Sequence, residues 1–411
     1  MSQNVILSGW GVSSAYAPDF PALVDGLAAQ RLVTTQPWFA TQSEWQDLRL
    51  SCNPHYAAQS QPTGTPFERL QAVIAQALGV AELDVAQLQG KRVRVYLVGH
   101  GERANIADFL GYQDRNDQEE LLFYPQIKRL HAASYAQDRL ARQLTQAYQL
   151  DWPPVSLYCA SNSSLAAVHL AQATVTAGDV DLVLVIGWLD TLMQDVIFLG
   201  GQDMLGDGRG QPFSNHDSSI LPTNGAVALI MESEQHARRR NVAPTVRLRS
   251  SVFCQSGGAR GSSSFTADFR TIAQTLERAI QQAGLTAPEI ACVFPHANGV
   301  IASDKAEAMA LQKIWGKSGI PVVSYKGQVG YMVTCCGLLD LMLAAEALQQ
   351  RRLLALTTRN PIDESLQIRV HADCPPLALH QSHILKSGIG LDGSAIAMVL
   401  SRYPEASNEQ G

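Results

Sequence analysis

Residues 155–178 of the chain read VSLYCASNSSLAAVHLAQATVTAG, and this stretch decides the fold. It opens with apolar, β-prone residues, breaks into small polar residues at 161–164 and continues as a helix that stops at Gly178. A strand that turns sharply into a helix places one small residue at the helix N-terminus, where unpaired N–H groups and the positive dipole end favour a nucleophile or a developing anion. The candidates for that position are Ser161 and Cys159.

A second stretch has the same layout. Residues 322–350 read VVSYKGQVGYMVTCCGLLDLMLAAEALQQ, which predicts a strand, a polar turn and a long helix that begins with small residues. Two such units predict a duplicated α/β fold. We expect an N-terminal half at 1–242, a C-terminal half at 243–403 and a disordered tail at 404–411. The first strand is expected at 4–7, ended by a glycine-rich turn around Gly9 and Gly11.

Composition and charge narrow the class of protein. The 411 residues are 46% hydrophobic with a net charge of -6, which indicates a packed globular protein and gives no reason to expect nucleic acid. The seven scattered cysteines argue for a reducing compartment and against a structural zinc site, and we expect neither a metal nor a cofactor. The chain lacks a signal-peptide pattern and an apolar run of membrane-spanning length, so we expect a cytoplasmic protein without membrane contact.

Four motifs, in order, resemble those of the β-ketoacyl synthase family of the thiolase fold. CASNSSLAAVHLA at 159–171 is similar to the family's Thr-Ala-Cys-Ser-Ser-Ser-Leu and the following Val-Ala-Val-His-Leu-Ala. HAN at 296–298 and SDKAEA at 303–308 stand where the family has His-Gly-Thr and Gly-Asp-Lys-Ala-Glu-Ala. KGQVGY at 326–331 stands where the family has Lys-Ser-Met-Thr-Gly-His, and GLDG at 390–393 stands where it has Gly-Phe-Gly-Gly. The resemblance covers nearly the whole chain and implies a thiolase-like duplicated fold of five layers, αβαβα, with two pseudo-symmetric halves.

Three of the positions that differ from the family pattern bear directly on the expected activity. Ser161 falls on the family's nucleophilic cysteine, Tyr331 on its second histidine and Leu391 on its gatekeeping phenylalanine. The first histidine, His296, and the lysine, Lys326, remain. The resemblance thus implies catalytic positions at Ser161, His296, Tyr331 and Lys326, and substrate-binding positions at Cys159, Asn298, Leu391 and Asp392.

These replacements weaken the chemistry of a ketosynthase, which loads an acyl group on a thiolate, decarboxylates a malonyl unit and joins the two. A helix dipole supplies at most about 2 kcal/mol, which activates a thiol but not a serine hydroxyl. Ser161 would need a general base, for which His296 is the only candidate among the matched positions. Tyr331 donates one hydrogen bond but is not cationic near neutral pH. Losing such an enolate-stabilising donor costs about 100- to 1000-fold.

Four functional hypotheses follow. The leading one is a chain-length-factor-like subunit that pairs with an active ketosynthase in a type II fatty-acid-like, polyketide or polyene pathway and meets its acyl carrier protein. The second is a serine-dependent acyltransferase or malonyl decarboxylase that uses Ser161 and His296. The third is an active synthase with a modified triad, and the fourth is a structural or regulatory pseudoenzyme.

Simpler interpretations stand beside the functional ones. Ser161 would then be a helix-capping serine, and Cys159 a small residue at a strand end, although a backbone shift would let Cys159 replace Ser161. Lys326 and Asp340 would form a structural ion pair, by analogy with the family. The basic run at 238–240 is either a solvated helix end or a contact for the acidic carrier protein.

Overall fold

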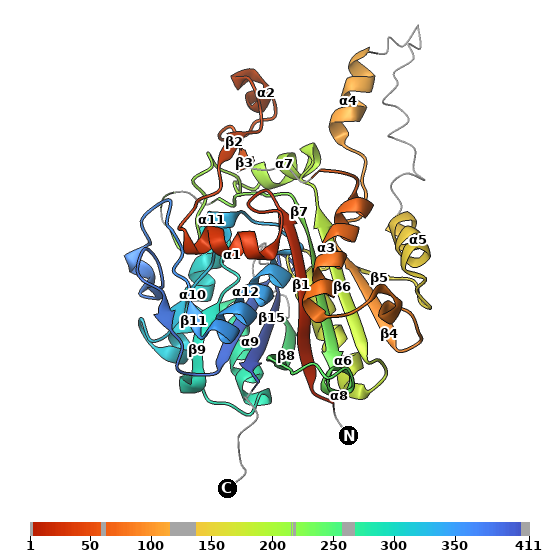
Figure 1. Cartoon of the computed structure of the whole chain (residues 1–411). Helices are drawn as coiled ribbons and strands as arrows, with labels where there is room; N and C mark the ends of the chain where they lie inside the picture. The colour runs from red at the N-terminus through yellow and green to blue at the C-terminus, as the bar shows by residue number, and fades with distance from the viewer. Residues whose placement is uncertain are drawn as a thin grey trace.

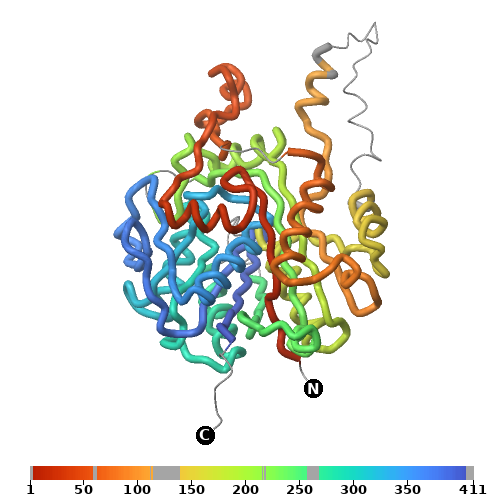
Figure 2. Tube along the Cα trace, viewed as in Figure 1, coloured from red at the N-terminus to blue at the C-terminus, as the bar shows by residue number. Residues whose placement is uncertain are grey.

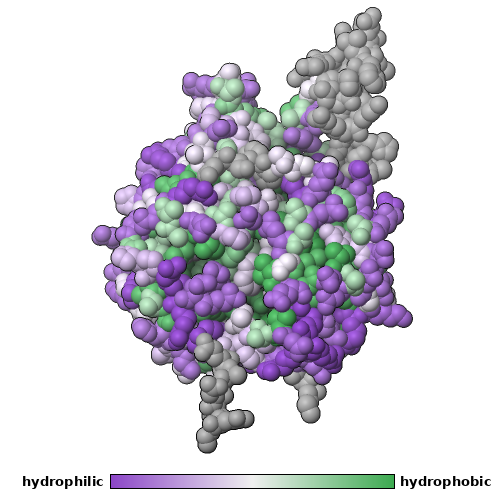
Figure 3. Space-filling view, viewed as in Figure 1, coloured by the Kyte–Doolittle hydropathy of each residue, from purple (hydrophilic) through white to green (hydrophobic). Residues whose placement is uncertain are grey.

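The computed structural model describes residues 3–58, 63–115, 137–214, 216, 219–256 and 268–403. The tail expected at 404–411 lies outside these ranges. Figure 1 shows both ends of the chain on one side of the body, while α2 (Gln42–Asp47) and α4 (Ile106–Arg115) project from the opposite side. In the described ranges, every helix is too short or too polar to cross a membrane. The face drawn in Figure 3 is mostly hydrophilic, with an apolar area around α3 (Pro66–Ala81).

The strands of the main sheet run in the order β12-β10-β9-β14-β15-β8-β1-β7-β6-β4-β5. Their bounds are β1 (Val5–Ser14), β4 (Val93–Val98), β5 (Val155–Leu157), β6 (Leu182–Leu189), β7 (Gly225–Ser233), β8 (Val246–Gln255), β9 (Ile290–Phe294), β10 (Pro321–Val322), β12 (Arg369–Val370), β14 (His383–Ile389) and β15 (Ser394–Arg402). Two small sheets pair β2 (Thr35–Pro37) with β3 (His55–Ala57), and β11 (Arg352–Leu353) with β13 (Leu377–Ala378).

The strand order confirms the predicted duplication. The run β1-β7-β6-β4-β5 has two antiparallel pairings followed by two parallel ones, and the run β8-β15-β14-β9-β10 has the same succession. A short antiparallel pairing of β1 with β8 joins the two runs. Figure 2 shows β1 running between the two halves of the molecule. We propose the boundary between the halves at 242/243, in the loop that precedes β8.

The helices complete the five layers. Helices α6 (Ser163–Ala177) and α12 (Cys336–Gln350) pack against each other and contact strands of both halves, so they form the central layer. Helix α3 covers the outer face of the first half, and α9 (Phe269–Gln282), with α10 (Ile301–Trp315) against it, covers that of the second. The other helices are α1 (Phe20–Ala28), α5 (Gln137–Tyr148), α7 (Met193–Gly200), α8 (Glu234–Arg239) and α11 (Lys326–Val329). Helix α12 is buried along most of its length, whereas α6 buries one side and leaves Leu170 exposed.

The turn expected at Gly9 and Gly11 was wrong, because β1 continues through both glycines to Ser14. A Cβ atom at Gly9 would lie 2.2 Å from the carbonyl oxygen of Ala77, and one at Gly11 would lie 2.3 Å from that of Val73. Both carbonyls belong to α3, so the two glycines let that helix approach the strand backbone. Glycine here marks close packing rather than a bend.

The two halves differ at their outer edges. In the first half, β5 pairs with β4 on one side, and no described strand pairs with its other side. Its residues Val155 and Ser156 are exposed. In the second half, the corresponding strand β10 pairs on its outer side with β12. Strand β12 consists of the exposed Arg369 and the half-buried Val370. Among the described strands, β5 thus has no neighbour on its outer side, whereas its counterpart β10 has the two-residue β12 there.

Candidate functional site

A cavity of about 350 Å³ lies where the turns after β5, β9 and α11 meet. Five of the residues that the resemblance singled out line it: Ser161, His296, Asn298, Tyr331 and Leu391. Cys159, Lys326 and Asp392 do not line it. The lining also includes the apolar side chains of Leu199, Met204, Ile220, Val300, Val333 and Ile389.

A tight turn carries Ser161 to the N-terminal end of α6. Ala160 adopts a φ of 42°, a left-handed conformation that side chains rarely take. The hydroxyl of Ser163 accepts a hydrogen bond from Cys159 N at 2.8 Å and donates one to Ala160 O at 2.7 Å. Asn162 Nδ2 donates to Ser394 Oγ at 2.8 Å, which ties the turn to β15. The turn is thus fixed from both sides, and Ser161 follows its strained residue.

Cys159 is directed away from the cavity. Its thiol lies 3.7 Å from Asp392 Oδ2, to which it donates a weak hydrogen bond. Burial and the negative charge of Asp392 raise the pKa of the Cys159 thiol. The two residues expected to bind substrate therefore contact each other, and in this conformation the thiol is not activated as a replacement for Ser161.

His296 is buried at the end of β9 and is held in a neutral form. Burial and the charges of Lys326 and Lys386 keep its pKa well below the usual range. Its ring lies edge-on to that of Tyr331, with 6.2 Å between the centroids. Within the described residues, no hydrogen bond joins the hydroxyl of Ser161 to the imidazole of His296. The pair shares a cavity without the contact that general-base activation requires.

Behind His296, Lys326 and Lys386 share one carboxylate. Asp340 Oδ2 lies 2.8 Å from Lys326 Nζ and 2.7 Å from Lys386 Nζ, so the expected ion pair of Lys326 with Asp340 is present but has a third member. Both ammonium groups also donate to Pro295 O, at 3.3 and 3.0 Å. Burial opposes all three charges, and the two lysines still hold the pKa of Asp340 below its usual value. The cluster fixes the carbonyl that immediately precedes His296.

Two acids on the first turns of α10 hold the rest of the loop. Glu307 accepts hydrogen bonds from the backbone N–H groups of His296 and Ala297 at 2.9 and 2.8 Å. Asp304 accepts from the N–H groups of Asn298 and Gly299 at 3.1 and 3.2 Å. Asp304 also accepts from Phe213 N at 2.7 Å. These buried carboxylates replace the secondary structure that the loop lacks.

Asp304 makes stability depend on pH. Burial, reinforced by the charge of Glu307, raises the pKa of Asp304 from 3.8 to about 7. The folded state therefore keeps a proton that the unfolded state releases, and this contribution is complete below about pH 3.8 and lost as the pH rises to about 7. The gap corresponds to about 4 kcal/mol at most. We expect the excess stability of the wild type over Asp304→Asn, from urea unfolding, to shrink between pH 4 and 7, and a constant difference would contradict this.

Tyr331 brings a buried hydroxyl into the cavity. Gly330, at a φ of 92°, turns the chain after α11, and Tyr331 N then donates to Leu221 O at 2.7 Å. Its hydroxyl lies beside Ser161 and Asn298, which both lower its pKa, but neither meets the geometry of an ordinary hydrogen bond. Burial is the stronger effect and raises the pKa of Tyr331 far above neutrality. The hydroxyl is thus always protonated and ready to donate.

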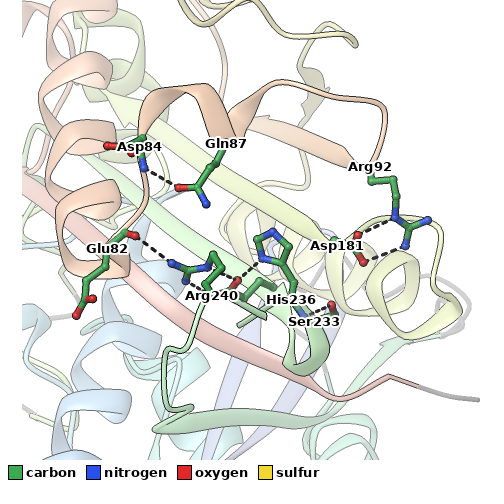
Figure 4. A network of polar contacts seen from close by, with 9 residues as sticks. Glu82, Asp84, Gln87, Arg92, Asp181, Ser233, His236 and Arg240 are labelled. Carbon is green, nitrogen blue, oxygen red and sulfur yellow. Dashed lines mark hydrogen bonds and ion pairs between the residues drawn. The ribbon is translucent and has the colours of Figure 1, made fainter. Parts of the chain in front are cut away.

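The basic run lies away from the cavity, in the polar network of Figure 4. Arg240 Nη2 lies 2.7 Å from the buried carboxylate of Glu232, and Arg240 Nη1 donates to the carbonyl of Glu82 at 3.0 Å. Arg238 pairs with Glu234 at 2.7 Å. Arg240 therefore fastens the end of α8 to β7 and to the residue after α3, while Arg238 pairs within α8, which supports a structural role for both.

Sequence reasoning missed several residues that shape the site. Asp304 and Glu307 belong to the SDKAEA motif, but the sequence predicted no role for them. Their spacing of three residues places both on one face of α10. Lys386 went unnoticed, although a lone lysine inside the apolar strand β14 signals a buried partner. Gln202 and Asp203, exposed at the rim of the cavity, follow α7 and carry no motif.

Comparisons with known proteins agree with this geometry. Polyketide synthase GfsA of Streptomyces halstedii is 22% identical over 98% of this chain, which spans 5% of that relative's length. A solved structure, "The ishigamide ketosynthase/chain length factor", matches with a TM-score of 0.81 at 17% identity, over 98% of this chain and 100% of that one. The structure of the complex AntDE:AntF matches with a TM-score of 0.79 at 14% identity, over 98% and 100%. These two likenesses show the thiolase-like fold.

The family follows from the sequence itself. Residues 55–237 match the N-terminal domain of beta-ketoacyl synthases, and residues 250–358 match the C-terminal domain. Together the two matches cover well over half of the chain. The chain therefore belongs to the β-ketoacyl synthase family.

Proposed function

We propose that this chain is a chain-length-factor-like subunit, which pairs with an active ketosynthase and shapes the cavity that receives the growing acyl chain. The observation that carries the proposal is the environment of Ser161, which lies beside the Tyr331 hydroxyl and has no hydrogen bond to His296. A serine without a base is not a nucleophile at neutral pH. The chain thus keeps the cavity of a condensing enzyme without its activated nucleophile.

The open edge at β5 supports a partner subunit. An unpaired edge strand offers N–H and C=O groups to another chain, and exposed apolar side chains beside it favour a stable contact. Val155 is 44% exposed and Tyr158 is 57% exposed. The exposed apolar residues on or near β5, α6 and the end of β8 are Trp152, Val155, Tyr158, Leu170 and Phe253. The likeness to a ketosynthase/chain length factor structure fits such a pairing.

The same comparisons support a proposal for the pathway. One structural neighbour is described as a type II PKS acyl-carrier protein in complex with its ketosynthase, bound to the hexaketide. We therefore propose that an acyl carrier protein serves the pair, in a type II polyketide or fatty-acid-like pathway in the cytoplasm. At the basic run, Arg240 already pairs with the buried Glu232, while Arg238 and Arg239 are exposed and remain a candidate contact for the acidic carrier protein.

Copurification tests the pairing. We expect the tagged chain, coexpressed with a ketosynthase that has an intact Cys-His-His set, to copurify with it in a one-to-one complex. Val155→Glu with Tyr158→Glu places two charges on the β5 edge and is expected to abolish the complex. Val80→Glu, on the outer face of α3 and similarly exposed at 51%, is the matched control and retains it. A monodisperse homodimer with condensing activity of its own would overturn the proposal.

A serine-dependent acyltransferase is the second candidate, favoured by one observation. Ser161 and a neutral His296 line the same cavity, and a neutral imidazole can accept a proton once a ligand brings the two together. This candidate requires an acyl-Ser161 adduct, whereas the leading proposal requires that no covalent adduct forms.

A further inference from the structure

Two of the polar side chains that line the cavity, Tyr331 and Asn298, are neutral and can donate hydrogen bonds. Tyr331 is 2% exposed, and its buried hydroxyl stays protonated and has no hydrogen-bond partner of ordinary geometry. Asn298 Oδ1 already accepts from Val300 N at 3.1 Å, which leaves the amide nitrogen of Asn298 as the free donor beside Tyr331. Two convergent neutral donors in a buried place match one carbonyl oxygen. A buried donor without a partner costs free energy that a ligand would recover.

The described side chains that line the cavity offer no cation to an anion. Among the described residues that line it there is no lysine or arginine, and Asp203 at the rim is the one charged side chain. The nearest buried cations, Lys326 and Lys386, lie behind the loop and are both held by Asp340. A carboxylate that entered would lose its hydration without gaining a counter-ion. The apolar side chains that form most of the lining favour a hydrocarbon chain instead.

We propose that the cavity binds a neutral acyl group reversibly, with its carbonyl oxygen on Tyr331 and Asn298, and excludes malonyl and other acyl groups that end in a carboxylate. This inference rests on the proposed function and specifies the ligand of the same site. It separates the chain from an enzyme that decarboxylates malonyl units, because such an enzyme must bind the anion. No bond is formed or broken in this step.

Calorimetric titration of the full-length chain tests the selection. The probes are octanoyl-N-acetylcysteamine, which is neutral, and malonyl-N-acetylcysteamine, which is an anion at pH 7. We expect the octanoyl thioester to bind at least about 100-fold more tightly, because burying an unpaired carboxylate is costly. Equal affinity, or tighter binding of the malonyl thioester, would overturn the inference, as would a covalent octanoyl adduct in intact-mass spectra.

Two tyrosine variants test the role of the Tyr331 hydroxyl. Tyr331→Phe is expected to weaken binding of the octanoyl thioester by up to about tenfold, the value of one hydrogen bond. The same variant is expected to unfold at a higher urea concentration, because it removes a buried hydroxyl without a partner. Tyr325→Phe is the matched control: Tyr325 is buried, but its hydroxyl donates to Leu354 O at 2.6 Å and does not line the cavity.

The two variants should therefore differ in both measurements. Tyr325→Phe should lower stability and leave the affinity for the thioester unchanged. If Tyr331→Phe leaves the affinity unchanged, the hydroxyl does not hold the carbonyl and the inference fails. The proposed function can fail separately. If the chain binds the octanoyl thioester but copurifies with no ketosynthase, the inference about the cavity stands and the proposed pairing is wrong.

Discussion

Replacing Asp340 by Asn is expected to lower the free energy of unfolding by about 3 to 5 kcal/mol, the usual cost of leaving buried charges without a partner. The substitution hardly changes volume, so it leaves no cavity. Among the described residues it removes the one carboxylate that both Lys326 and Lys386 contact, and these side chains are 3% and 1% exposed. Urea unfolding of wild type and variant, followed by circular dichroism at pH 7, measures the loss.

Lys386→Met provides the control for this prediction. It removes one of the two ammonium groups and leaves Lys326 and Asp340 as an intact pair. Burial already lowers the pKa of Lys386, so replacing it by an apolar side chain of similar length should cost no more than about 1 kcal/mol. If Asp340→Asn destabilises the protein no more than Lys386→Met does, the two lysines do not depend on this carboxylate.

Gly9→Ala is expected to destabilise the protein by about 3 kcal/mol, at the upper end of the cost of overpacking. The added methyl group would lie 2.2 Å from Ala77 O and 2.7 Å from Ala81 Cβ. Neither neighbour can move by a rotamer change, because one is a helix carbonyl and the other a methyl group fixed to α3. The whole helix would have to shift away from β1, which lies beside β8 at the junction of the two halves.

Gly79→Ala is the matched control on the same helix. A Cβ atom at Gly79 meets nothing within 4 Å, so the substitution adds helix propensity without a clash. It should raise stability by about 0.5 to 1 kcal/mol. The same glycine-to-alanine change should thus lower the free energy of unfolding at Gly9 on β1 and raise it at Gly79 on α3, as measured by urea unfolding. A loss of stability at Gly79 equal to that at Gly9 would show that the close packing of α3 on β1 is not the cause.

Sequence reasoning reached the fold because the strand–turn–helix units carry their own local signals. The small residues around Ser161 and the apolar helix after it follow from local rules of capping and burial. The same rules failed at Gly9, where glycine serves a helix that lies far along the chain. Periodicity along a strand reports which face is buried, but not how closely a distant helix approaches.

The site was predictable where its residues belong to turns that follow regular elements. Ser161, His296 and Tyr331 follow β5, β9 and α11, so motif spacing brought them to one cavity. Lys386 was not predictable in this way, because its role depends on Asp340, which lies on a different element. The orientation of Cys159 toward Asp392 also depends on a contact between distant residues, which no local pattern reports.

The unequal sheet edges have a consequence for stoichiometry. A sheet that accepts strands at both ends can grow without limit, whereas one that accepts a strand at a single end stops after one addition. Here the apolar Val155 and Tyr158 flank the available end, and the opposite end finishes in two residues with the exposed Arg369. We expect one added subunit to cover this apolar edge and to leave only the short, charged edge at β12. We expect assemblies of two chains even at high concentration, and no filaments.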